Sequence, residues 1–222
     1  MDIIKTYPCD ARNYSKRKGK IEYIVIHYVG ATGGAKANAI YYGHNDVGAS
    51  AHFYVGHASE GTPVYQSVDP KHRAWHCGSE TGKYKHPYCR NDNSIGIEIC
   101  CHYDEARGWY FDKETVDAAV ELTKHLMQLY SVPIEKVIRH YDVTGKCCPA
   151  PFVNDESAWT SFKNRLITAP ELTEPNDIVW ELAHRGIVTD SVGMLDEMDA
   201  EPNGRLYWLA RKVVHFMRKN NV

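Results

Sequence analysis

Two stretches of this chain are apolar at almost every position, and they restrict its possible folds more than any other feature. Residues 21–29 read Ile-Glu-Tyr-Ile-Val-Ile-His-Tyr-Val, and residues 94–101 read Ser-Ile-Gly-Ile-Glu-Ile-Cys-Cys. Nearly continuous runs of β-branched and aromatic residues are typical of strands that are buried on both faces. We therefore expect these stretches to be central strands of a sheet.

Other predicted elements surround these two strands. Residues 50–55 and 63–68 have the pattern of a strand hairpin, and a further strand begins at 134–138. Helices are expected over 35–45, over 159–167, and after Asp112, whose side chain can cap a helix that ends before Pro133. Residues 1–20 are expected to form a lead-in arm, and 69–93 a long loop of a kind that often carries function.

A change in composition divides the chain near residue 168. We expect one domain over 1–167, a proline-containing linker over 168–175 and a helical segment over 176–222. In that segment, Asn176 or Asp177 can cap a helix over 178–184 that ends at Gly186. The final helix has an expected apolar stripe and a basic face; the stripe is Leu206, Leu209, Val213, Phe216 and Met217, and the basic face is Arg205, Arg211, Lys212, Arg218 and Lys219. About fifty residues is short for an independent core, so the segment is expected to dock on the first domain or on a second copy, as a homodimer.

Composition excludes several classes of protein. Apolar residues make up 43% of the 222 residues, which argues against disorder, and the net charge of -2 argues against a nucleic-acid partner. The sequence has neither a signal-peptide pattern nor an apolar run long enough to span a membrane, so we expect synthesis in the cytoplasm and no membrane span. The seven cysteines are expected to be free thiols or metal ligands. A bond between Cys77 and Cys89 is the alternative if the protein reaches the outside of a cell.

Metal-binding side chains gather at the ends of predicted strands. His27 ends the first apolar strand, and His140 follows the strand that begins at 134. Two adjacent thiols, Cys147 and Cys148, come seven and eight residues after His140. Two imidazoles and one thiolate give Zn²⁺ three protein ligands and leave the fourth position open, which is typical of a catalytic zinc site.

Two further residues have the chemistry that a zinc hydrolase needs. Glu98 lies within an apolar strand, where a carboxylate is unfavourable unless it is paired or serves a site. Lys146 lies two residues before Cys148 and is expected to point into the same crevice. A carboxylate can act as general base, and an ammonium group can stabilise an oxyanion.

Five pieces of sequence together resemble one enzyme family. They are Ile24-Val25-Ile26-His27-Tyr28, Ser50-Ala51-His52-Phe53, Ala74-Trp75-His76, Asn93-Ser94-Ile95-Gly96-Ile97-Glu98, and His140 followed after seven residues by Cys148-Pro149. In this order they resemble the zinc-dependent N-acetylmuramoyl-L-alanine amidases related to peptidoglycan recognition proteins, in the phage endolysin and bacterial autolysin branch. The resemblance covers about residues 20–167.

The resemblance implies a fold, a site and a substrate. The fold would be α/β, with a central mixed sheet flanked by helices. His27, His140 and Cys148 would hold zinc, while Glu98 and Lys146 would be catalytic. The substrate would be peptidoglycan, cut between N-acetylmuramic acid and the L-alanine of the stem peptide after the protein is released to the cell wall. The segment over 176–222 would bind wall polymer or mediate dimerisation.

The chain departs from some relatives at two positions. Some family members have a catalytic tyrosine where this chain has Ala51, which favours Glu98 as the base. The muropeptide-recycling branch uses an aspartate as third ligand, and Cys148 argues against that branch.

Simpler interpretations remain beside these expectations. His52 is expected to be a packed or supporting histidine, and Cys147 competes with Cys148 as the thiolate ligand. Trp75 and His76 are expected to contact substrate, although packing of the long loop explains them equally well. A non-catalytic peptidoglycan-binding module and an unrelated zinc amide hydrolase are the alternative functions.

Overall fold

The computed structural model describes residues 2–79 and 81–167, together with 179, 182–183, 186–190, 194–195, 204, 209–210, 213–214 and 217. The chain divides into two compact units, residues 1–167 and 168–222. No helix in the described part is long and apolar enough to cross a membrane.

The first unit is built on a six-stranded mixed sheet with the strand order β1-β5-β4-β7-β3-β10. Its strands are β1 (Ile3–Ile4), β3 (Tyr23–Tyr28), β4 (Phe53–Val55), β5 (Val64–Gln66), β7 (Ser94–Ile99) and β10 (Val137–Arg139). Strand β3 pairs in parallel with both β7 and β10, and β7 pairs in parallel with β4. The hairpin of β4 and β5 is antiparallel. The two longest apolar runs therefore lie side by side at the centre of the sheet, as expected.

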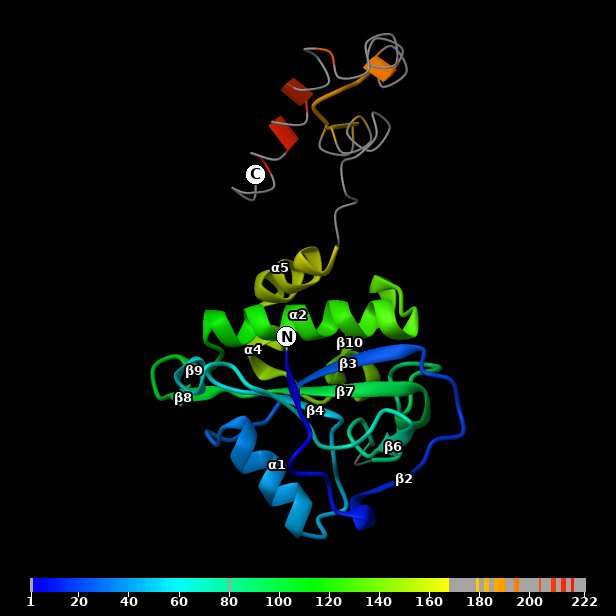
Figure 1. Cartoon of the computed structure of the whole chain (residues 1–222), viewed down its shortest axis with the longest axis vertical. Helices are drawn as coiled ribbons and strands as arrows, with labels where there is room; N and C mark the ends of the chain where they lie inside the picture. Colours follow the sequence, from blue (N-terminus) through cyan, green and yellow to red (C-terminus); the bar gives the residue numbers. More distant parts are fainter. Residues whose placement is uncertain are drawn as a thin grey trace. The chain divides into compact units, whose positions relative to one another are not determined.

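Helices cover both faces of this sheet (Figure 1). Helices α2 (Lys113–Tyr130) and α5 (Glu156–Leu166) lie on one face, and α1 (Ala35–His44) lies on the other. Two short helices, α3 (His140–Thr144) and α4 (Ala150–Val153), connect β10 to α5. The α/β prediction, with a central mixed sheet flanked by helices, is confirmed.

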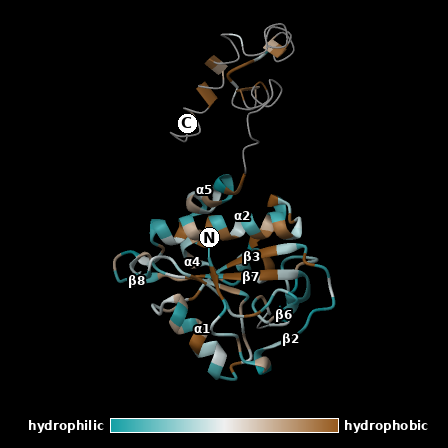
Figure 2. Ribbon diagram, viewed as in Figure 1, coloured by the Kyte–Doolittle hydropathy of each residue, from teal (hydrophilic) through white to brown (hydrophobic). Residues whose placement is uncertain are grey.

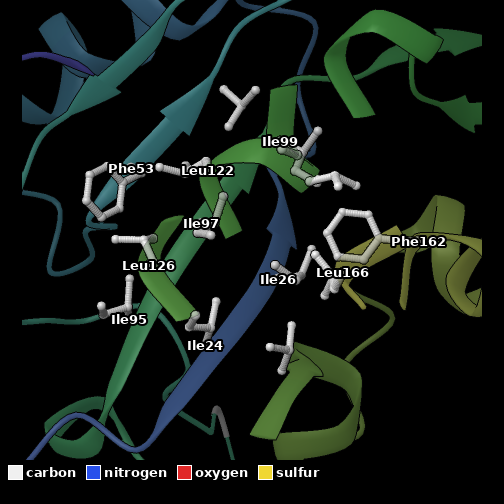
Figure 3. Close-up of a cluster of buried hydrophobic side chains, with 14 of the residues drawn as sticks. Ile24, Ile26, Phe53, Ile95, Ile97, Ile99, Leu122, Leu126, Phe162 and Leu166 are labelled. Carbon is white, nitrogen blue, oxygen red and sulfur yellow. The ribbon is translucent and has the colours of Figure 1, made fainter. Parts of the chain in front are cut away.

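The main core lies between the sheet and α2 and α5. Alternate residues of the central strands point to this side, among them Ile24 and Ile26 from β3 and Ile97 from β7 (Figure 3). They pack against Leu122 from α2 and Phe162 from α5, and all of these side chains are at most 1% exposed. The apolar strands and the polar outer surfaces of the helices stand out when the chain is coloured by hydropathy (Figure 2). Burial of this apolar face fixes the strand register, because a slip of one residue would turn it toward solvent.

The opposite face of the same strands carries polar and small residues. In β7 these are Ser94, Gly96 and Glu98, which alternate with the isoleucines of the core. In β3 the corresponding residue is His27, which lies directly opposite Glu98 in the strand pairing. The alternation that builds the core therefore brings an imidazole and a carboxylate together on the other face.

Short strands were not expected from the sequence. Strand β1 lies in the predicted lead-in arm, and β2 (Tyr14–Lys16) pairs with β6 (His72–Ala74), which lies in the predicted long loop. A second hairpin joins β8 (His102–Asp104) to β9 (Gly108–Tyr110). Each contains two or three residues, too few to show a strand period, so the expectation of an unpaired arm and loop is wrong at these positions.

Several predicted boundaries also shift. The strand expected over 50–55 begins only at Phe53, the closing helix begins at Glu156 rather than 159, and the strand expected from 134 begins at Val137 after a 3₁₀ turn. The residues after His140 form the short helix α3.

Asp112 precedes α2 as expected, but its carboxylate does not cap the helix. It accepts hydrogen bonds from the Ala58 backbone N–H at 3.2 Å and from His102 Nε2 at 2.9 Å instead. The predicted side-chain cap is therefore wrong, because neighbouring segments already occupy the carboxylate.

The second unit has a small apolar cluster of its own, in which Val179, Leu182, Ala210 and Val214 are buried. Leu209 and Val213, expected on the apolar stripe, are 52% and 37% exposed. At the described positions, the buried residues Ala210 and Val214 each follow a predicted stripe residue by one position. The predicted linker, the caps at 176 and 177, Leu206, Phe216 and all five residues of the predicted basic face lie outside the described residues.

Candidate active site

The candidate site is assembled from segments that are far apart in the sequence. His27 comes from β3 and Glu98 from β7, which are paired neighbours in the sheet. His140 begins α3, immediately after β10, which pairs with the other edge of β3. Cys148 is held close to α3 because its carbonyl accepts a 2.8 Å hydrogen bond from the Tyr141 N–H. The residues at the ends of the parallel strands thus lie close together, at the edge of the sheet where open α/β sheets bind ligands.

Three metal-binding side chains converge here. The ligand atoms of His27, His140 and Cys148 all lie within 4.8 Å of one another. Cys148 Sγ is 3.6 Å from His27 Nδ1, and the two imidazole rings have centroids 4.8 Å apart and planes inclined by 60°. All three side chains are buried, with residue exposures of 1%, 4% and 4%.

Their environment fits a metal ion. His140 Nε2 is buried and has no hydrogen-bond partner among the described residues. Burial holds the pKa of His27 well below its usual value and lowers the pKa of His140 to about 4, so both imidazoles are neutral at pH 7 and offer lone pairs. Burial also raises the pKa of the Cys148 thiol, so a cation must displace its proton. Two nitrogens and one sulfur are a donor set that suits zinc.

Glu98 faces the same three residues. Its Oε1 is 4.0 Å from His27 Nδ1, and its Oε2 is buried without a hydrogen-bond partner in the described part of the chain. Burial raises the pKa of Glu98 to about 8, although the nearby Lys146 lowers it. With a neutral His27, the pair is not an ion pair at neutral pH. A carboxyl group with a pKa near 8 can both accept and return a proton close to physiological pH.

A cleft of about 370 Å³ opens onto these residues. His27, Glu98, His140 and Cys148 line it together with Lys146 and with Trp75 and His76 of the long loop. Every residue predicted for the site therefore borders one cavity. Their catalytic and substrate-binding roles stay predictions.

The two competing candidates lie elsewhere. His52 is fully buried, its Nδ1 accepts a 3.0 Å hydrogen bond from the Gly96 N–H, and its Nε2 lies 3.2 Å from the His72 carbonyl. Cys147 is exposed, and its Sγ points to Asn154 Oδ1 at 3.7 Å. Neither belongs to the cluster of ligand atoms found among the described residues. Cys77 and Cys89, whose bond was the alternative to free thiols, are both buried free thiols in this structure.

A second group of metal-binding residue types, His57, His102 and Asp112, was not expected. The rings of His57 and His102 are stacked, with centroids 4.3 Å apart and planes inclined by 29°. Imidazole lone pairs lie in the ring plane, so two nearly parallel stacked rings do not direct them at one ion. The 2.9 Å hydrogen bond between His102 and Asp112 accounts for this group.

Sequence reasoning missed two residues that shape the site. Ser94 Oγ lies 3.1 Å from His76 Nε2, and Gly96 leaves room for the His76 ring: a Cβ at Gly96 would lie 2.5 Å from His76 Cγ. Both stand on the same face of β7 as Glu98, so the alternation of that strand was the available signal.

Comparison with known proteins places these features in a family. The model of a family described as N-acetylmuramoyl-L-alanine amidase matches residues 17–151, which include all seven predicted site residues. The chain is 31% identical over 155 residues to the N-acetylmuramoyl-L-alanine amidase CwlL of Bacillus licheniformis. It is 30% identical over 158 residues to the N-acetylmuramoyl-L-alanine amidase BlyA of Bacillus subtilis (strain 168). Each match covers 66% of this chain but only 41% of the relative, so the chain spans about two fifths of the length of these curated proteins.

Solved structures with the same fold cover most of the first unit. The structure of PlyL superposes with a TM-score of 0.61 at 26% identity, and it covers 75% of this chain and 97% of that one. The catalytic domain of XlyA superposes with a TM-score of 0.58 at 29% identity, and it covers 75% of this chain and 99% of that one. The similarity is therefore to nearly whole structures of this fold.

Proposed function

Because the chain belongs to the N-acetylmuramoyl-L-alanine amidase family, we propose that it is a peptidoglycan hydrolase that cuts the amide bond between N-acetylmuramic acid and the L-alanine of the stem peptide. The proposal is supported by the curated amidases to which it is similar and by a cleft that combines metal-binding residues with a carboxyl group and a lysine. Its substrate partner is the bacterial cell wall.

His27, His140 and Cys148 would hold a zinc ion. The observation that carries this assignment is the convergence of two neutral, buried imidazoles and one buried thiol within 4.8 Å. Bound zinc supplies Lewis-acid chemistry and lowers the pKa of a water molecule to about 7. Three protein ligands leave a fourth position for the reacting groups.

Glu98 would be the proton carrier. Hydrolysis of an amide requires a proton to leave the attacking water and another to reach the nitrogen of the departing amine. Glu98 is supported in both steps by its place in the cleft and by its pKa of about 8, since such a group exchanges protons readily near neutral pH. Its Oε2 is buried and has no hydrogen-bond partner among the described residues.

Lys146 would stabilise the negative charge that develops on the carbonyl oxygen. It lines the cleft from the loop that also carries Cys148, so its ammonium group can approach the same reacting bond. Loss of a single oxyanion-stabilising donor commonly lowers kcat by about 10²–10³. Trp75 would form an apolar wall of the cleft against sugar or peptide.

The test is the identity of the ends that the protein creates in purified peptidoglycan. We expect new L-alanine amino termini and no new reducing sugar ends, inhibition by a chelator and recovery with added Zn²⁺. Glu98→Gln should retain zinc and lose turnover, whereas the exposed Cys147→Ser should behave as wild type. New reducing ends, or amino termini other than alanine, would refute the proposed bond. Binding without any cleavage would favour the non-catalytic module.

The second unit would bind wall polymer and hold the catalytic unit near insoluble substrate. The division of the chain into two compact units supports this proposal, because a targeting unit can fold apart from the catalytic one. The homodimer predicted through this segment stays a prediction. The protein would act on the wall after release from the cytoplasm.

A further inference from the structure

His76 borders the cleft and also contacts one of the proposed metal ligands. Its side chain is buried, with a residue exposure of 9%. Its Nδ1 is 3.0 Å from His27 Nε2, and its Nε2 is 3.1 Å from Ser94 Oγ. Both ring nitrogens are therefore occupied by protein partners, which leaves His76 no polar atom for a substrate.

Arg90, Ser94, His76 and His27 form a series of hydrogen bonds. The donor and acceptor of each bond can be assigned by starting from the Arg90 carbonyl. Ser94 Oγ is 2.7 Å from the Arg90 carbonyl, which can only accept, so the single hydroxyl proton of Ser94 points to Arg90. Ser94 must then accept from His76, which places the His76 proton on Nε2. In its neutral form the His76 imidazole has one N–H, so Nδ1 accepts in that form. His27 Nε2 must therefore donate.

The tautomer of His27 determines which of its nitrogens can bind a metal. A neutral His27 that is protonated on Nε2 has its lone pair on Nδ1, and Nδ1 is the atom 3.6 Å from Cys148 Sγ. The opposite tautomer would direct an N–H at the metal position. A hydrogen bond to the second nitrogen is how proteins select the ligand atom of a histidine.

We propose that His76 is a positioning residue that holds His27 in the tautomer whose Nδ1 binds the metal. The identity of the ion as zinc rests on the proposed function; the tautomer itself does not. Gly96 helps to position His76, because any larger residue there would collide with the His76 ring. The expected contact of His76 with substrate stays a prediction beside this role.

Three substitutions separate the hydrogen bond from the shape of the side chain. His76→Phe keeps a ring of similar size and removes the acceptor. His76→Asn places its amide oxygen near the position of Nδ1 and can still accept from His27. Gly96→Ala leaves every hydrogen-bonding group unchanged but displaces the ring. His57→Phe, at a buried histidine outside the cleft, is the matched control.

The direct measurement is long-range ¹H–¹⁵N correlation of the histidine rings in full-length, metal-free protein. We expect His27 to be protonated on Nε2 in wild type, in His76→Asn and in the His57→Phe control. In His76→Phe and Gly96→Ala we expect a mixture of tautomers. Wild-type His27 protonated on Nδ1, or as a mixture, would overturn the proposal.

Zinc affinity gives a second readout, by competition with a chromophoric chelator. His76→Phe should weaken zinc binding by about 10–100-fold, and His76→Asn should restore most of it. Unchanged zinc affinity in a folded His76→Phe variant would also overturn the proposal. If His76→Phe does not fold, the zinc affinity of Gly96→Ala is compared with that of wild type instead. A wild-type protein that binds no zinc would refute the proposed cofactor while the tautomer result stands on its own.

Discussion

Glu98 should make the metal-free protein less stable as the pH rises. Its side chain is 20% exposed, its Oε2 is buried without a partner among the described residues, and burial raises its pKa to about 8 from the ordinary value of 4.5. The folded protein therefore keeps the Glu98 proton over a range of pH in which the unfolded chain has released it. Glu98→Gln is the perturbation that tests this, because glutamine has nearly the same shape and no titratable proton.

The direction and size of the change in the free energy of unfolding follow from proton linkage. Between about pH 4.5 and pH 8 the folded state binds more protons at this site, so the free energy of unfolding falls as the pH rises and levels off above pH 8. At 1.36 kcal/mol for each pH unit, the interval from 4.5 to about 8 corresponds to roughly 5 kcal/mol. Partial exposure of the side chain reduces this, and we expect about 3–5 kcal/mol.

The assay is urea unfolding of wild type and Glu98→Gln at pH 5, 6, 7 and 8 in the presence of a chelator. The variant should be similar to wild type at pH 5 and more stable by about 3–5 kcal/mol at pH 8. His27 and His140 titrate in both proteins, so their contributions cancel in the difference. Cys147→Ser, which changes no carboxyl group, should follow wild type throughout. A stability difference that does not change with pH would refute the reasoning.

Three further outcomes are expected. Cys148→Ser should weaken zinc binding by more than about 100-fold in a metal-content assay, whereas Cys147→Ser should retain the ion; the reverse would make Cys147 the ligand. Lys146→Met should lower kcat on a soluble muropeptide by about 10²–10³ while zinc content is unchanged, and a change confined to KM would assign Lys146 to substrate binding. A protein truncated after residue 167 should unfold cooperatively and cleave soluble muropeptide at the wild-type rate. It should sediment less with insoluble cell wall than the full-length protein does. Loss of folding would show that the second unit completes the core.

The central strands were predictable because their signals are local. Strand β3 and strand β7 lie within the two apolar runs, and α2 follows the helical spacing of its buried positions. The paired strands β1, β2, β6, β8 and β9 were missed because two or three residues do not show a period. The partners of β1 and β2 lie about sixty residues away, outside any sequence window, whereas β8 and β9 form a local hairpin.

The residues of the candidate site were also predictable from the sequence, but their arrangement was not. His27, His140, Cys148, Glu98 and Lys146 could be selected from the sequence because their residue types and spacing are those of zinc and acid–base chemistry. Between the adjacent thiols, the family resemblance had selected Cys148, and the fold adds a geometric reason: Cys148 is buried toward His27, whereas its neighbour Cys147 is exposed.

The two buried strands, the alternation that gives β7 one apolar and one polar face, and the set of residues able to bind a metal all follow from local sequence. How those residues are used depends on contacts between distant segments. His76 and His27 are 49 positions apart, and their 3.0 Å contact exists because the long loop folds over Gly96. The pKa of Glu98 is likewise a property of burial, since the same carboxyl group in the unfolded chain is surrounded by water.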